Sequence, residues 1–339
     1  MLGALLLVPS CGGGSARPER LAGFAIPACL RTIQPPDGEP RNFWDSVAPS
    51  ITKRYLATTA TGCDGKIYLV GGLVPRSDFD ESGDADQTGA LEIYDPGANA
   101  WSPAPAMPTP RSELGAVTGR DGRIYAIGGG VGDQFAPSDA VEVYSPDSNT
   151  WEAAAPLPIA MDEVNATVDR NGNMYAINEG TMAIYNAKDG TWSLGPPMPT
   201  PRDRMTVAAG SDGKIYAIGG FGGTGEEHGP VDAVEAYSPS TGGWEKRKRL
   251  PISLGETAGV VSFDGKIYVF GGQTGVNWDW SSAAYAYTPE KDSWEKIPSM
   301  PVDRHEHSAA IGPDGRMYVI DGDAAGDVTN RVDVFTPGG

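Results

Sequence analysis

The residues best suited to chemistry are charged side chains that recur at a fixed distance after a proline. Six segments begin with Ala-Pro, Met-Pro or Leu-Pro, and the fifth residue past each proline is charged. These six residues are Arg54, Glu113, Glu163, Arg204, Glu256 and Glu306. Arginine suits carboxylate recognition because its fork donates two parallel hydrogen bonds. We therefore expect either a polar ligand site, with Arg54 and Arg204 as the anchors of an anionic group, or an ion ring that only satisfies itself.

A second group lies in the segment 303–307, which holds two of the three histidines of the chain. In an extended strand, His305 and His307 would point to one face and Glu306 to the other. A His-x-His pair can begin a metal site, but the sequence shows no third ligand. We count Arg304, His305 and His307 among the candidate ligand-binding residues and expect neither a metal nor another cofactor.

Two tryptophans, Trp278 and Trp280, alternate with Asn277 and Asp279. Exposed tryptophans with polar neighbours suit the faces of sugars or the centre of a protein interface. The alternative is a loop that folds back on its own part of the structure. Motifs of common hydrolases, P-loop proteins and zinc proteases do not occur in the sequence, which favours binding over catalysis.

A repeated pattern of turns and aromatic strands must position these side chains. An Asp-Gly or Asn-Gly pair stands three residues before a tyrosine six times, which predicts six hairpins with type I′ turns. Paired glycines, a second tyrosine and a tryptophan follow in most copies. The six hairpin tyrosines, roughly 50 residues apart, are Tyr68, Tyr125, Tyr175, Tyr216, Tyr268 and Tyr318.

This order of Gly-Gly, Tyr and Trp resembles the kelch motif, whose copies form the four-stranded blades of a β-propeller. The resemblance covers residues 42–339 and implies an all-β, six-bladed propeller with antiparallel blades. The sixth unit ends without a tryptophan, whereas Trp44 near the other end has no unit of its own. We therefore expect residues 42–47 to complete the last blade as its outermost strand.

The first 41 residues are expected to lie outside the propeller. Residues 1–11 resemble the signal of a bacterial lipoprotein, with an apolar run that ends at Cys11, the expected lipidation site; an ordinary signal peptide is the alternative. Residues 12–41 have the composition of a flexible linker. Export permits disulfides, and we expect Cys29 to pair with Cys63, although two unpaired thiols remain possible.

Charge and family resemblance together indicate the partners. The net charge of −18 excludes nucleic acid as a ligand. We expect a monomeric, lipid-anchored recognition module, facing the periplasm or the cell exterior, that binds a glycan or an extracytoplasmic protein. Architectural similarity to sialic acid mutarotases suggests a sugar-acting enzyme as the alternative. The galactose oxidase central domain is similar in architecture too, but its copper ligands have no counterparts here.

Overall fold

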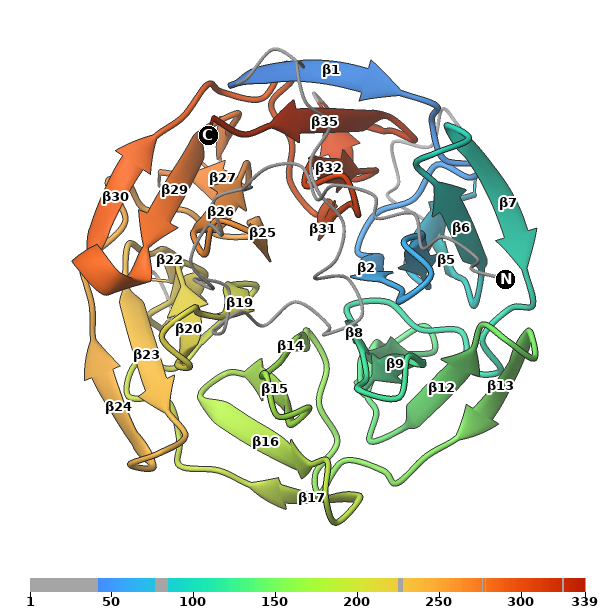
Figure 1. Cartoon of the computed structure of the whole chain (residues 1–339), viewed down its shortest axis with the longest axis horizontal. Coiled ribbons are helices and arrows are strands. Elements are labelled where there is room, and N and C mark those ends of the chain that lie inside the picture. The colour runs from blue at the N-terminus through green and yellow to red at the C-terminus, as the bar shows by residue number, and fades with distance from the viewer. Residues whose placement is uncertain are drawn as a thin grey trace, which may run out of the picture.

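The computed structural model describes residues 42–76, 85–224, 228–275, 277, 279–324 and 326–338. Six four-stranded antiparallel sheets surround a central channel (Figure 1). Their innermost strands contact one another all the way round the channel. The expected all-β kelch-type propeller is confirmed. Within the described part of the chain, no helix is long and apolar enough to cross a membrane.

The sheets, here called blades one to six, are given from the innermost strand outward. Blade one contains β2 (Thr58–Thr61), β3 (Ile67–Val70), β6 (Leu91–Asp95) and β7 (Ala100–Ala104). Blade two contains β8 (Gly115–Thr118), β9 (Ile124–Ile127), β12 (Val141–Ser145) and β13 (Thr150–Ala153). Blade three contains β14 (Asn165–Val168), β15 (Met174–Asn178), β16 (Thr181–Asn186) and β17 (Thr191–Leu194).

The remaining three blades follow the same order. Blade four contains β19 (Thr206–Ala209), β20 (Ile215–Ile218), β23 (Val234–Ser238) and β24 (Gly243–Lys246). Blade five contains β25 (Ala258–Val261), β26 (Ile267–Phe270), β29 (Ala284–Thr288) and β30 (Ser293–Lys296), with the short 3-10 helix η3 (Pro289–Lys291) before its last strand. Blade six contains β31 (Ser308–Ile311), β32 (Met317–Ile320), β35 (Val332–Thr336) and β1 (Phe43–Val47).

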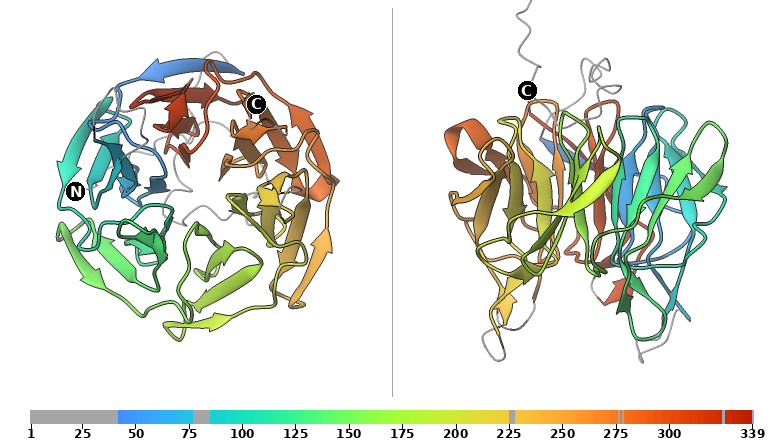
Figure 2. Two further views of the ribbon diagram at one scale, coloured as in Figure 1. Left: turned by 180° about the vertical axis from the view of Figure 1, so that it is seen from behind. Right: turned by 90° about the horizontal axis from the view of Figure 1, so that it is seen from below.

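Short strands extend loops on one face of the propeller, as the side view shows (Figure 2). Most of them lie between the second and third strands of five blades, whereas residues 202–203 stand just before the innermost strand of blade four. They are β4 (Leu73–Pro75) with β5 (Ala85–Gln87), β10 (Gly130–Val131) with β11 (Ala136–Pro137), β18 (Arg202–Asp203) with β21 (Phe221–Gly222) and β22 (Gly229–Pro230), β27 (Gln273–Thr274) with β28 (Asp279–Trp280), and β33 (Asp323–Ala324) with β34 (Asp327–Val328).

The hairpin turns form where the sequence predicts them, but they are not of type I′. In blade one, the N–H of Gly65 donates to the carbonyl of Gly62, and only Gly65 has a positive φ, of 78°. This geometry is that of a type I turn followed by a left-handed glycine. The carboxylate of Asp64 accepts a hydrogen bond from the Tyr68 hydroxyl at 2.8 Å, which fixes the start of the next strand.

Strand β1 takes the place that the sequence assigns to residues 42–47, at the outer edge of blade six beside β35. The indole of Trp44 packs against Phe335 and Phe270, and its Nε1 donates to the carbonyl of Pro298 at 2.8 Å. In blade one, Trp101 Nε1 donates in the same way to Ala48, at 2.9 Å. The outermost tryptophans thus connect each of these blades to a preceding segment.

The expected signal segment and linker, residues 1–11 and 12–41, lie outside the described residues, as do Cys11 and Cys29. Cys63 is disulfide-bonded. Because the chain has only two other cysteines, its partner also lies outside the described residues. The pairing of Cys63 with Cys29 stays a prediction.

Candidate functional site

Six residues with left-handed backbone conformation form a ring around one mouth of the central channel. Each stands two residues before an innermost strand, and together they line a cavity of about 190 Å³. Positive φ is uncommon outside glycine, and such strain gathers at functional sites. The residues, with φ between 45° and 55°, are Leu56, Glu113, Glu163, Arg204, Glu256 and Glu306. We call this set the mouth ring.

Backbone hydrogen bonds between blades hold the mouth ring in place. The N–H of Glu113 donates to the carbonyl of Leu56, and the N–H of Leu56 donates to that of Glu306, both at 3.0 Å. A third bond, of 2.8 Å, joins Glu256 to Arg204 in the same way. The backbone that bears the charged groups of the mouth ring is therefore held in place by hydrogen bonds between neighbouring blades.

Arg54 does not belong to the mouth ring, so the sequence-based assignment is wrong at this position. Blade one has two more residues between its proline and its arginine than blade two, so the seventh residue past Pro49, Leu56, takes the ring position. Arg54 is completely buried. It pairs with Glu92 at 2.5 Å and lies 3.6 Å from Asp321.

Arg304 is a buried structural residue of the same kind, so the prediction that it binds a ligand is wrong too. It pairs with Asp333 at 2.5 Å inside its own blade, with 0% of its surface exposed. Arg111 and Arg202 make equivalent pairs with Glu142 and Glu235. An ion pair at this depth is compensated within the blade and leaves little capacity for a ligand.

Arg204 is the single cation of the mouth ring, and three glutamates engage it. Its Nε donates to Glu163 at 2.7 Å, its Nη1 donates to Glu256 at 2.7 Å, and its Nη2 donates to Glu113 at 3.3 Å. Arg54 and Arg204, expected to anchor an anionic group together, do not meet at the mouth, because Arg54 is buried in its blade. All three nitrogens of the guanidinium are occupied, so Arg204 is not a free anchor for an anion.

Four ring carboxylates against one guanidinium leave the mouth acidic. Burial raises the pKa of Glu163 to about 7, although Arg204 acts in the opposite direction. Burial also raises the pKa of Glu306 to about 7, and the nearby charge of Glu256 adds to this increase. The pKa of Glu113 is raised by burial as well. At neutral pH the mouth therefore holds both carboxylates and carboxylic acids, which can accept and donate hydrogen bonds.

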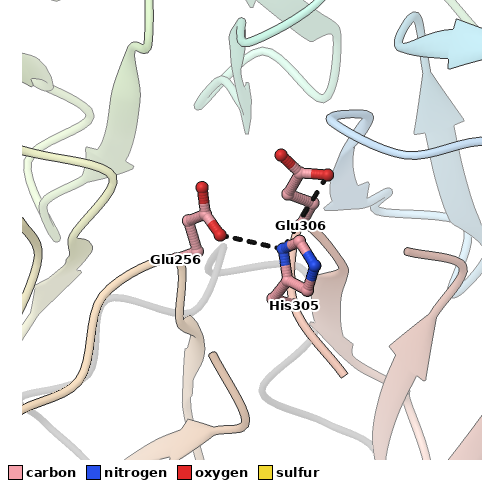
Figure 3. A group of neighbouring side chains, drawn as sticks. All are labelled: Glu256, His305 and Glu306. Atoms are coloured by element: carbon pink, nitrogen blue, oxygen red, sulfur yellow. Dashed lines mark hydrogen bonds and ion pairs between the residues drawn. The ribbon is translucent and has the colours of Figure 1, made fainter. Parts of the chain in front are cut away.

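His305 joins the mouth ring from its outer side (Figure 3). Its Nδ1 lies 2.8 Å from Glu256 Oε2 and 3.8 Å from Glu306 Oε2. Burial opposes charge on the imidazole, but the hydrogen bond to Glu256 and the charge of Glu306 hold its pKa above the ordinary value. The sequence placed Glu256 and Glu306 in one set of charged residues but gave no sign that His305 meets Glu256.

The other predicted residues divide between the rim and the core. Trp280 is half-exposed and stacks on His305, with ring centroids 5.7 Å apart, so it forms part of the rim. Trp278 lies outside the described residues. His307 is buried at a position that Leu114 takes in blade two, and burial lowers its pKa to about 3. Although His307 borders the cavity, it is a neutral packing residue, and it does not form the expected pair with His305.

The comparisons with known proteins match this architecture. Models of the kelch motif match residues 56–108, 111–158, 204–251 and 257–301, which together make up more than half of the chain. The chain belongs to the kelch-repeat family. A solved structure titled "Structure of YjhT" is similar to this kelch propeller with a TM-score of 0.65 and 16% sequence identity, over 85% of this chain and 97% of that one. At this identity the likeness shows the fold alone.

Two curated relatives are also kelch proteins. Kelch-like protein 33 from Homo sapiens is 33% identical over 95 residues, and Kelch-like protein 21 from Danio rerio is 27% identical over 78 residues. The matches cover 27% and 23% of this kelch chain but only 16% and 11% of those proteins. These matches therefore concern the kelch repeat alone and say nothing of the activity of the whole relatives.

Proposed function

We propose that this propeller is a recognition module that binds a glycan rich in hydroxyl or amino groups at the channel mouth. The observation that carries the proposal is the set of four glutamates around one arginine, on an open cavity. Carboxylates accept hydrogen bonds from hydroxyl and ammonium groups. Trp280 at the rim offers an apolar face of the kind that packs against a sugar ring.

The charge of the mouth disfavours anionic ligands. A sugar acid would meet an excess of carboxylates, whereas Arg204 is already held by Glu113, Glu163 and Glu256. Arg54 and Arg204 therefore do not serve as anion anchors in this proposal, and neutral or amino sugars are the first ligands to test. A basic segment of an extracytoplasmic protein would meet the same favourable charge.

Binding to an array of neutral, amino and sialylated glycans tests this proposal. Glu113→Gln removes one charged acceptor, and we expect it to weaken binding of the best glycan at least about tenfold, since hydrogen bonds to charged groups contribute about 1.5–3 kcal/mol. The matched control is Asp147→Asn, which makes the same charge change at an exposed position outside the mouth. A clear preference for sialylated glycans, or equal affinity of both variants and the native chain, would contradict the proposal.

A sugar-acting enzyme is the second candidate, favoured by Glu163. A carboxyl with a pKa of about 7 is suited to give and take protons at neutral pH, as the opening of a sugar ring requires. Exchange NMR spectroscopy on a reducing neutral sugar directly measures the rate at which its anomers interconvert. Faster exchange that Glu163→Gln abolishes would establish catalysis, and exchange at the uncatalysed rate would leave binding as the function.

Export and lipid anchoring complete the proposal. The apolar run before Cys11 and the glycines after it support a lipoprotein that faces the periplasm or the cell exterior. Mass spectrometry of the native N-terminal peptide should find a diacylglycerol group on Cys11. A mature chain that begins elsewhere without lipid would refute the anchor and leave the proposed ligand site untouched.

A further inference from the structure

Two glutamates and a histidine from neighbouring blades converge at the mouth in a way that the glycan proposal does not use. The donor atoms of Glu256, His305 and Glu306 all lie within 4.8 Å of one another. As Figure 3 shows, both carboxyl groups lie on the Nδ1 side of the imidazole. Three ligands around one ion of ordinary coordination geometry would require small movements from these positions.

We propose that Glu256, His305 and Glu306 bind a divalent transition-metal ion, with Zn²⁺ as the first ion to test. Imidazole with two carboxylates suits zinc and its first-row neighbours, whereas calcium and magnesium prefer oxygen ligands alone. Three protein ligands leave at least one coordination position open. Both glutamates border the mouth cavity, so that position is accessible to water or to a ligand atom.

Neighbouring groups orient two of the three ligands. Glu256 accepts a hydrogen bond from Arg204 through Oε1, so its Oε2 is directed toward His305. Backbone hydrogen bonds in both directions between His305 and Asp323, of 3.1 and 3.0 Å, fix the histidine segment. Trp280 covers one face of the imidazole. Support of this kind is what holds metal ligands in position in known sites.

Charge balance is an independent reason to expect a cation. Four glutamates of the mouth ring, some of them protonated at neutral pH, face one guanidinium, and Asp323 adds a carboxylate 3.8 Å from His305 Nε2. A divalent ion beside Glu256 and Glu306 would offset most of this excess. The inference does not depend on the glycan proposal, because a metal can bind whether or not a sugar does.

The competing account is a plain hydrogen bond between His305 and Glu256 with no ion. Calorimetry with Zn²⁺ alone, on untagged protein first dialysed against a chelator, distinguishes the two. We expect one ion per chain. His305→Asn and Glu306→Gln should each weaken binding at least about 100-fold, because loss of even a supporting partner costs 10–100-fold.

Asp162→Asn is the matched control, because Asp162 takes the place in blade three that His305 takes in blade six. It removes a charge near the mouth without removing a donor, so its affinity should change by less than about tenfold. Thermal unfolding of the metal-free variants checks that each is folded. A native chain that binds Zn²⁺ no more tightly than millimolar, or a folded His305→Asn variant with native affinity, would overturn the site.

Co²⁺ provides a measurement that needs no variant. Bound to the native chain, it should shift the ring-proton NMR signals of His305, which a chemical-shift assignment identifies. If only His228 shows paramagnetic shifts, or if no histidine does, the ion lies elsewhere and the assignment is overturned. Retained glycan binding in excess chelator would leave the proposed function intact even then.

Discussion

Replacing Trp44 with alanine tests whether β1 holds the ring closed in solution. The indole packs against Phe335 at 5.1 Å and against Phe270 at 5.5 Å, and each such aromatic pair contributes about 1 kcal/mol beyond buried area. The hydrogen bond from Nε1 to Pro298 adds about 1 kcal/mol. The expected loss in the free energy of unfolding is therefore at least about 3 kcal/mol, which is the lower end of the range for Trp→Ala, because Trp44 is only half-buried.

Urea unfolding followed by circular dichroism measures this loss. Trp101→Ala is the matched comparison, because Trp101 packs on Tyr94 at 5.1 Å and donates to Ala48, but makes one aromatic pair fewer. It should destabilise the chain by about 2 kcal/mol. If Trp101→Ala destabilises and Trp44→Ala does not, β1 does not contribute to the closed ring. Deleting residues 1–47 should then be harmless too, instead of exposing the edge of β35.

Three further predictions follow from the buried charges and the disulfide. Burial raises the pKa of Asp321 to about 8, so the folded chain keeps a proton that the unfolded carboxyl loses near pH 4. The proton on Asp321 therefore contributes stability that is fully present below about pH 4 and is lost as the pH rises toward 8. Unfolding midpoints should therefore fall from pH 5 to 8 more steeply in the native chain than in Asp321→Asn, and parallel profiles would contradict this. Arg202→Met should cost about 3–5 kcal/mol because it leaves Glu235 unpaired, and adding Glu235→Gln should recover part of the loss in urea unfolding. Non-reducing peptide mapping should find Cys63 linked to Cys29, and Cys63→Ser should leave Cys29 as a free thiol.

The fold could be predicted from the sequence because each blade repeats its local signals. A turn, an aromatic strand and paired glycines recur together, so an error in one copy is corrected by the others. The turn type was predicted wrongly because Asp-Gly fits two hairpin geometries. At Asp64, the aspartate bonds to Tyr68 four residues on, and only Gly65 takes a positive φ. Residue preference alone did not distinguish these geometries.

The site was predicted less well because loop length varies between blades. Counting from proline placed Arg54 in the mouth ring, whereas counting from the buried arginines places Leu56 there. Arg54, Arg111, Arg202 and Arg304 each stand two residues before a ring position, and this spacing was visible in the sequence. The meeting of His305 with Glu256 was not visible, because 49 residues separate them and only the packing of two blades brings them together.

The buried arginines of the blades and the one arginine of the mouth ring differ in how many acids surround each of them. Each buried arginine, such as Arg202, meets at least one acid within its own blade, as a folded interior requires. The mouth ring instead sets one arginine against four glutamates on strained backbone. Closing a channel does not require excess charge, since leucine fills the same position in blade one with the same left-handed backbone. The carboxyl groups that Arg204 does not engage are therefore the feature on which both proposals rest, a cation or a donor-rich ligand at the mouth.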